Sequence, residues 1–340
     1  MSVRDAFLRQ AKACATMGSP FTARLCTLAE ARLVPGSAVA DRILEWEGDA
    51  GPSADSVPLR LAGALHALRL QDKALQDVYP PADVRDHDLW GAIEAAFADH
   101  REEILYWLES PPQTNEVRRS AVLLPVFARL WALYGMALDL SELGASGGLN
   151  LRADQYHLAL PGGGLGPETS PVQLTPDWEG PLPAGPLPPV RNRAGVDLNP
   201  LDPTSEAGRL RLSAYLWADQ ADRLAHTTAA IDIAAAHPAT VTAGDAADWL
   251  ESALTPRPGH THLIYHTVAW QYFPAEVQAR AEALIRAAGA KATPEAPLAW
   301  FGMEADGGRG AGLTLRCWPG DHEVAIGRAD FHGRWITWVG

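Results

Sequence analysis

A glycine-rich turn directly after an apolar run constrains this chain more than any other segment. The turn is Gly144-Ala145-Ser146-Gly147-Gly148; it follows residues 136–140 and the acid Glu142, and Asn150 comes soon after it. Glycine permits positive φ angles and lets the backbone come close to a ligand. Open α/β sheets bind small molecules where a strand leads through such a turn into a helix. The segment therefore predicts an α/β fold with a ligand site after one of its strands.

The composition excludes several classes of function. The chain has 28 Lys and Arg against 41 Asp and Glu, a net charge of −13, and such a surface repels nucleic acid. It contains no apolar run of about eighteen residues, and its N-terminal residues lack a signal-peptide core, so we expect no membrane partner. The three cysteines show no CxxC spacing, so we expect no metal and a cytoplasmic location.

The first third of the chain has helical periodicity. We predict helices over residues 21–33, 37–48, 58–79, 89–108 and 114–134, with a loop at 48–57. The sequence Ser110-Pro111-Pro112 interrupts this pattern. It predicts an N-terminal helical domain at 1–112, placed as a cap on a second domain at 113–340.

From residue 137 onward, short apolar runs alternate with helices. We predict strands at 137–143, 193–198, 239–243, 262–268, 298–303, 313–318 and 324–331, and helices at 206–236, 246–254 and 275–288. This alternation favours a doubly wound, mainly parallel, seven-stranded Rossmann-like sheet. The short link at 319–322 predicts a terminal antiparallel hairpin. Residues 157–190, rich in Gly and Pro, are expected to form an inserted loop or hairpin.

Three acids are placed where predicted strands end. Glu142 precedes the glycine turn, Asp197 precedes Asn199, and Asp245 precedes Ala246. In a parallel sheet these ends share one edge, where Asp197 is suited to a ribose diol and Asp245 to an adenine amino group. The alternatives are an Asx turn at Asp197, a helix N-cap at Asp245 and a turn cap at Glu142. A P-loop lysine and the GxGxxG fingerprint are both absent from the turn.

The pattern resembles the class I S-adenosylmethionine-dependent methyltransferases. The matching residues are Glu142 to Gly148, Asp197, and Gly244-Asp245-Ala246. The resemblance implies bound S-adenosylmethionine, a small-molecule methyl acceptor, and a cofactor site that comprises Glu142, Gly144, Ser146, Gly147, Gly148, Asn150, Asp197, Asn199, Asp245, Ala246 and His266. One feature departs from that family: Asp197 lies further beyond the turn than the usual roughly twenty residues.

Nearly the whole chain also resembles an uncharacterised bacterial family, the domain-of-unknown-function 2332 family. The matching segments are 114–119, 142–151, 195–200, 266–272 and 332–335. This resemblance is specific for the family, but it does not imply a particular activity.

Several side chains near the predicted strand ends have two interpretations. His266 is a weak candidate for a general base, or a hydrogen-bonded strand-end residue. Trp270 and Tyr272 are candidates to contact a sulfonium through cation–π interaction, or belong to the core. The arginines at 118 and 119 either reach a methionine carboxylate or form structural ion pairs.

Two other functions compete with methyl transfer. One is a non-catalytic protein that binds S-adenosylmethionine or a nucleoside. The other is a serine hydrolase, because residues 144–148 also match GxSxG, with Ser146 as nucleophile, Asp245 as acid and His322 or His332 as base. The hydrolase leaves the acids Glu142 and Asp197 unexplained. His260 and His262 lack a nearby third ligand in the sequence, so neither alternative includes a metal.

Overall fold

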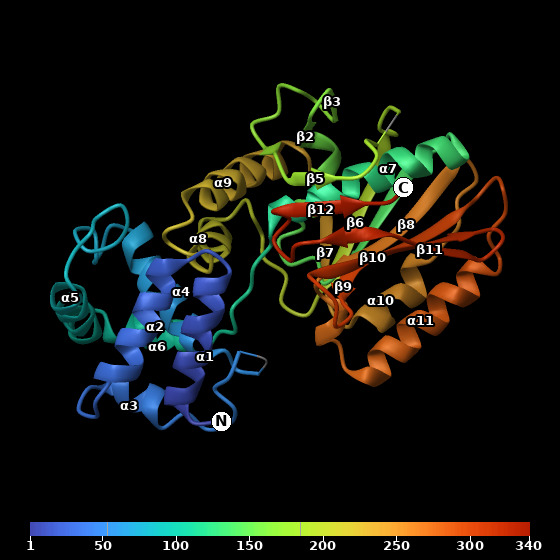
Figure 1. Ribbon diagram of the computed structural model, residues 1–340. Coiled ribbons are helices and arrows are strands. Elements are labelled where there is room, and N and C mark those ends of the chain that lie inside the picture. The colour runs from blue at the N-terminus through green and yellow to red at the C-terminus, as the bar shows by residue number, and fades with distance from the viewer. Residues whose placement is uncertain (53, 184) are drawn as a thin grey trace. The chain divides into compact units, whose positions relative to one another are not determined.

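The computed structural model in Figure 1 describes residues 1–52, 54–183 and 185–340. Positions 53 and 184, which fall in the expected loop 48–57 and the expected insertion 157–190, lie outside the described residues. The chain divides into two compact units. We call them the helical unit, Met1–Thr114 with Glu206–Ala225, and the sheet unit, Asn115–Ser205 with His226–Gly340.

The described helical unit begins with six helices, and a serine caps each of the first three. They are α1 Val3–Thr16, α2 Pro20–Arg32, α3 Ala38–Leu44, α4 Val57–Leu70, α5 Asp86–Asp99 and α6 Arg101–Leu108. Ser2, Ser19 and Ser37 each accept a backbone N–H in the first turn of α1, α2 and α3. These bonds satisfy amide groups that a helix start otherwise leaves unpaired.

Two of the predicted N-terminal helices are broken within their expected ranges. The helix expected at 58–79 ends at Leu70, because Asp72 and Leu75 adopt φ of +54° and +73° and turn the chain. The helix expected at 89–108 is two helices, α5 and α6, which meet at His100. Apolar spacing continues through both sites, so periodicity alone does not locate the breaks.

The segment Glu206–Ala225 packs within the helical unit. It contains α8 Glu206–Ala214 and the start of α9 Ala221–Ala236, so the single helix expected at 206–236 is interrupted. Asp219 holds the link between these helices by accepting from Ser19 Oγ at 2.6 Å and from the backbone N–H of Phe21 at 2.8 Å. The return of this segment is a tertiary feature that the sequence pattern did not indicate.

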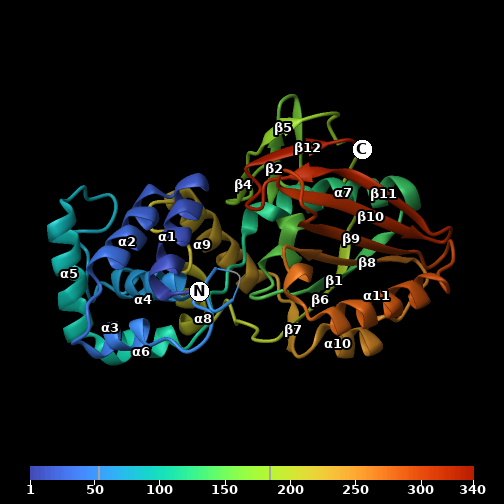
Figure 2. The same ribbon diagram turned by 60° about the horizontal axis from the view of Figure 1, so that its bottom comes forward.

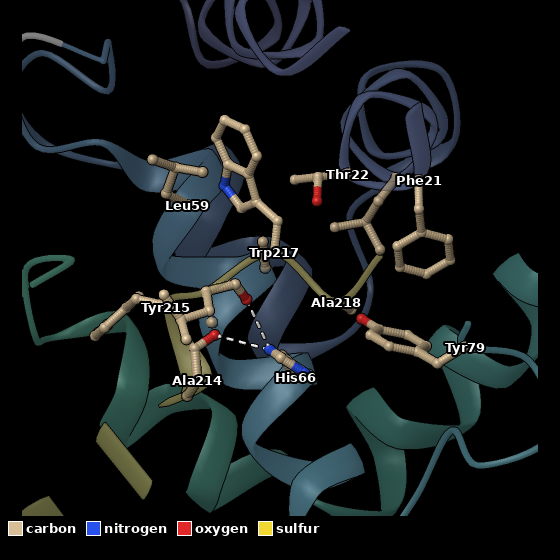
Figure 3. Close-up of a pocket in the computed structure, with 13 residues that line it drawn as sticks. Phe21, Thr22, Leu59, His66, Tyr79, Ala214, Tyr215, Trp217 and Ala218 are labelled. Carbon is tan, nitrogen blue, oxygen red and sulfur yellow. Dashed lines mark hydrogen bonds between the residues drawn. The ribbon is translucent and has the colours of Figure 1, made fainter. Parts of the chain in front are cut away.

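His66 of α4 holds the same link from within a small pocket (Figure 3). Its Nδ1 lies 3.2 Å from the carbonyl oxygen of Ala214 and 2.9 Å from that of Leu216. Carbonyl oxygens only accept, so Nδ1 carries a proton. Burial lowers the pKa of His66, which keeps the imidazole neutral at pH 7. Tyr79, labelled in Figure 3, belongs to the helical unit's own core and lines the same pocket, as does Trp217.

The sheet unit contains the large α/β sheet. Among the described residues its strand order is β5-β12-β11-β10-β9-β8-β1-β6-β7. The strands are β1 Ala137–Leu143, β5 Asp177–Glu179, β6 Val190–Asp197, β7 Thr240–Ala243, β8 His260–Thr267, β9 Leu298–Ala305, β10 Ala311–Trp318, β11 His322–Ala329 and β12 Trp335–Trp338. The strands β7, β6, β1, β8 and β9 are parallel, which confirms the α/β class and the mostly parallel centre.

The expected strand count of seven is wrong, because the described sheet has nine. The antiparallel pair β10–β11 is present as predicted, but β9 also pairs antiparallel with β10, and β12 pairs antiparallel with β11. The short strand β5 then joins β12 in parallel. Both additional strands are at most four residues long, too short for a clear period-two pattern.

Helices cover both faces of the parallel region, as Figure 2 shows. The helix α7 Ser120–Tyr134 lies on one face, and α10 Ala246–Ala253 and α11 Ala275–Gly289 lie on the other. Leu143, Val196 and Ile264 of the sheet pack with the buried residues of α10 and α11 in one apolar core. This core fixes the strands whose carboxyl ends form the candidate site.

The region expected as an insertion is partly built into the fold. It contains a second small sheet of β2 His157–Leu160, β3 Gly163–Leu165 and β4 Gln173–Leu174, and then β5. Because β5 joins the main sheet at β12, the segment extends the sheet edge instead of forming only a loop.

Candidate functional site

The glycine turn after β1 adopts the left-handed conformation that its sequence predicts. Gly144, Ser146 and Gly148 have φ of +72°, +52° and +65°. The backbone N–H groups of Gly144 and Ala145 donate to the carbonyl oxygen of Val196 at 2.9 and 3.0 Å. The turn is therefore attached to the end of β6 and leads into the short 3-10 helix η2, Leu149–Gln155. A serine at positive φ is strained, which is a common property of functional turns.

Asp197 links the turn to the ends of two other strands. Its Oδ2 accepts from the N–H of Ser146 at 2.8 Å, and its Oδ1 accepts from the N–H of Asn199 at 2.9 Å. Its backbone carbonyl accepts from Gly244 at 3.0 Å. The Asx turn considered as an alternative is therefore present, and it coexists with a contact to the glycine turn. The segments expected to meet at one edge do meet.

Asp245 is the N-cap of α10. Its Oδ1 accepts from the N–H of Ala247 at 2.8 Å and of Asp248 at 3.2 Å. Ala246, the first helical residue, is buried. The capping interpretation of Asp245 is thus shown by the geometry, and it uses one of the two carboxylate oxygens.

Glu142 is buried on the α7 side of the sheet and is 2% exposed. Its Oε2 accepts from the hydroxyl of Tyr265, its neighbour on β8, at 3.4 Å. Burial raises the pKa of Glu142 to about 8, although the positive charge of nearby Arg152 opposes the shift. A carboxyl with that pKa is largely protonated at pH 7. A nearby cation would lower the pKa and favour the ionised form.

Asn150 holds the turn to the start of α7. Its Oδ1 accepts from Ser120 Oγ at 2.7 Å, and its Nδ2 donates to the carbonyl oxygen of Glu116 at 3.3 Å. Asn115 acts beside it, because its Oδ1 accepts from the N–H of Leu149 at 2.7 Å. Asn150 is buried, and both the oxygen and the nitrogen of its amide bind protein groups.

The arginines at 118 and 119 have structural partners. Arg119 donates through Nε to the carbonyl oxygen of Phe331 and through Nη1 to that of Thr267, both at 2.9 Å. Arg118 pairs with Glu116 at 3.3 Å. Arg119 therefore joins the end of β8 to the loop after β11, and the structural interpretation of this pair is the one the contacts support.

His266 lies on the opposite face of the sheet from Glu142, since its neighbour Tyr265 faces Glu142 and side chains alternate along a strand. Its Nδ1 lies 2.8 Å from Glu304 Oε1, and Trp300 Nε1 donates to its Nε2 at 3.1 Å. An indole can only donate, so Nε2 is the unprotonated nitrogen and Nδ1–H donates to the carboxylate. The one lone pair of His266 is already engaged, which does not support a general base.

The aromatic residues after β8 differ in their placement. The ring of Trp270 stacks on His266 with centroids 4.8 Å apart and an interplanar angle of 23°. Trp270 also packs against the core under α10 and α11, as the core interpretation expected. Tyr272 is 68% exposed at the end of the 3-10 helix η3 Trp270–Tyr272.

The contacts do not favour the hydrolase. Ser146 Oγ is buried and has no hydrogen-bond partner in the described part of the chain, so no histidine there accepts its proton. His322 is on β11, four strands from β1, which is about 19 Å at ordinary strand spacing. Asp245 caps α10 instead of orienting a histidine.

A different serine and histidine do meet in the sheet. Ser141 Oγ lies 2.8 Å from His262 Nε2, and Asp139 is the register partner of His262. Burial lowers the pKa of His262 to about 4. All three side chains are buried within the sheet unit. The described residues contain no group of three potential metal ligands.

Three residues near the site were missed in the sequence. Glu304 lies one residue beyond the strand predicted at 298–303. As a further acid at a predicted strand end, it could have been recognised in the sequence. Tyr265 and Arg152 carried no signal, because their role depends on lying near Glu142 in the folded chain.

A family model described as "Uncharacterized protein conserved in bacteria (DUF2332)" matches residues 4–338. The chain belongs to this family. Membership confirms the resemblance drawn from the sequence motifs, and the family's description states no activity. No curated protein and no solved structure shows a significant match. Among the residues that the structure describes, no helix is long and apolar enough to cross a membrane.

Proposed function

We propose that the sheet unit binds S-adenosylmethionine at the carboxyl ends of β1, β6 and β7 and transfers its methyl group to a small molecule. One observation carries the proposal: the carboxylate of Asp197 lies against the backbone N–H of Ser146 at 2.8 Å. This contact puts Asp197, which we propose as the acid that binds the ribose diol, directly beside a left-handed glycine turn. That combination suits a ribose next to the rest of a nucleoside ligand.

The carboxylate of Asp197 has the chemistry that binds a diol. Two backbone N–H groups, those of Ser146 and Asn199, are among its partners. Hydroxyl groups of a ribose would bind the same carboxylate through charge-assisted bonds, which are about twice as strong as neutral ones. The backbone bonds also fix the orientation of the carboxylate before any ligand arrives.

Two further features fit the cofactor. Ser146 Oγ is buried without a partner among the described residues, and an unsatisfied buried hydroxyl costs about 1–3 kcal/mol. A polar group of the methionine moiety would satisfy it. At Gly244, an added Cβ would meet nothing within 4 Å. The surface beside Asp245 is therefore open at this point, where we propose that adenine binds.

The chain's own contribution would be binding and orientation. S-adenosylmethionine supplies a methyl group on a sulfonium, which is a good leaving group, so alignment with the acceptor provides much of the rate. Glu142 would face the cationic end of the ligand in its ionised form. We assign no general base, because His266 Nε2 accepts from Trp300.

The same contact at His266 favours one second candidate, a protein that binds S-adenosylmethionine without transferring its methyl group. The two candidates share the site and differ only in turnover. Incubation with methyl-labelled cofactor and a pool of small-molecule acceptors separates them.

The binding claim is tested with S-adenosylhomocysteine, a stable analogue. We expect it to raise the melting temperature of the wild-type protein, and Asp197→Ala to abolish that increase. Asp202→Ala is the matched control, since Asp202 is an exposed acid after the same strand whose carboxylate accepts from Thr204. Native mass spectrometry of the purified protein would reveal a co-purified adenosyl ligand. A folded wild-type protein that shows neither shift nor ligand rules the proposal out.

A further inference from the structure

Glu304, at the end of β9, binds three donors with one oxygen. Its Oε1 accepts from His266 Nδ1 at 2.8 Å, from the N–H of Ala269 at 2.9 Å and from the N–H of Trp270 at 3.1 Å. Burial raises the pKa of Glu304, but the hydrogen bonds from His266, Ala269 and Trp270 lower it, and the pKa lies below its usual value. The carboxylate is therefore ionised, and bonds to a charged acceptor are strong.

The segment that Glu304 binds has an unfavourable backbone conformation. Val268 has φ of +53°, and a β-branched residue is rarely found in the left-handed region. Its N–H donates to the carbonyl oxygen of Met303 at 2.8 Å. Such a conformation persists only where surrounding contacts determine it. The next two residues in the chain, Ala269 and Trp270, are held by their bonds to Glu304, and these bonds are contacts of that kind.

This segment lies against the glycine turn. A Cβ added at Gly144 would be 2.6 Å from the Cβ of Ala269, closer than two non-bonded carbon atoms can approach. The absence of a side chain at Gly144 and the placement of Ala269 thus depend on each other. Any movement of Ala269 changes the wall of the turn.

We propose that Glu304 is a positioning residue that holds Val268, Ala269 and Trp270 against the glycine turn and so shapes the methionine end of the cofactor site. The same carboxylate fixes the ring of His266, on which Trp270 stacks. One acid on β9 thereby joins the loop after β8 to the turn after β1. The cofactor part of this inference rests on the proposed function; the positioning part does not.

Backbone amide exchange tests the positioning part without a ligand. In Glu304→Ala we expect the amides of Ala269 and Trp270 to exchange at least about tenfold faster, because they lose a charged acceptor. Exchange at Leu263 and Tyr265 within β8 should stay unchanged. Glu304→Gln retains an oxygen acceptor and should restore part of the protection. Glu323→Ala removes an exposed strand carboxylate and is the matched control.

Unchanged exchange at Ala269 and Trp270 in folded Glu304→Ala would overturn the inference. The second measurement is calorimetric affinity for S-adenosylhomocysteine, which we expect Glu304→Ala to weaken about tenfold and Glu304→Gln to weaken less. Faster exchange with unchanged affinity would overturn the link to the cofactor site. If the wild-type protein binds no S-adenosylhomocysteine, the proposed function fails, and the exchange measurement still decides the role of Glu304.

Discussion

The backbone N–H of Ser146 donates to Asp197 Oδ2 at 2.8 Å, although the two residues are 51 positions apart. The small sheet β2–β4 and strand β5 are built from the residues between them. The chain leaves the parallel region after η2 and returns to it as β6, directly beside β1. The long spacing between turn and acid therefore does not separate them in space.

Ionisation of Glu142 should make stability depend on pH. Its pKa is about 8 in the folded protein and about 4.3 in an unfolded chain, so between these values the folded state holds a proton that the unfolded state releases. Folding stability from this group therefore falls as pH rises from about 4 to 8. Glu142→Gln cannot ionise, so its melting temperature relative to wild type should rise across this range. An equal difference in melting temperature between Glu142→Gln and wild type at pH 5 and pH 8.5 would contradict the raised pKa of Glu142. Glu282→Gln, at an exposed glutamate, is the control.

Binding should be coupled to the same proton. A cationic ligand group near Glu142 favours the carboxylate, so wild-type affinity for S-adenosylhomocysteine should increase from pH 6 to pH 8. Glu142→Gln should bind with little pH dependence over that interval. Calorimetry in two buffers of different ionisation enthalpy measures the proton released on binding, and an equal pH dependence in both proteins would refute the coupling.

Gly144→Ala should destabilise the sheet unit more than its backbone angle alone explains. Left-handed φ costs an alanine about 1–2 kcal/mol, and the contact with Ala269 adds an overpacking cost of about 1–3 kcal/mol. Gly135→Ala isolates the first cost, because Gly135 has φ of +64° and a Cβ there would meet nothing within 4 Å. Urea unfolding of both variants gives the difference. Equal losses would show that Ala269 moves freely.

His66→Phe should loosen the link between α8 and α9. Phenylalanine retains the ring but leaves the carbonyls of Ala214 and Leu216 without their donor, at a cost of about 1–3 kcal/mol. Burial lowers the pKa of His66, so an unfolded chain takes up a proton below about pH 6.5 that the folded state excludes. Wild-type stability from this group therefore falls as pH decreases, and His66→Phe should lack that decrease.

Proteolysis within residues 214–220 measures the loosening at pH 7.5 and pH 5.5. His87→Phe, on the exposed face of α5, is the control and should leave cleavage unchanged. Equal cleavage of His66→Phe and wild type at pH 7.5 would show that these bonds do not hold the segment.

A fluorophosphonate probe should label neither Ser146 nor Ser141 in the folded protein. Ser146 Oγ lacks a histidine partner among the described residues, and Ser141, which has one, is buried. Mass spectrometry of probe-treated protein checks both sites. Stoichiometric labelling of Ser146 that Ser146→Ala removes would restore the hydrolase.

The central strands could be predicted because each has a local signal. The run at 137–143 matches β1, and the runs at 239–243 and 262–268 match β7 and β8 to within two residues. Buried parallel strands carry continuous apolar residues, and polar turn residues delimit them. The strands β5 and β12 have no such signal, since β12 depends on pairing with β11 and β5 depends on pairing with β12.

The sequence by itself determined the parallel centre of the sheet, the left-handed glycine turn and the acids at the strand ends, because these features depend on hydrophobic pattern and on backbone angles that few residues adopt. Tertiary structure alone decided what each acid does. Asp197 reaches the turn, Asp245 caps a helix, Glu142 is buried under Tyr265, and Glu304 holds the loop after β8. Strand register and face decide these partners, and both are set by packing between segments distant in the chain.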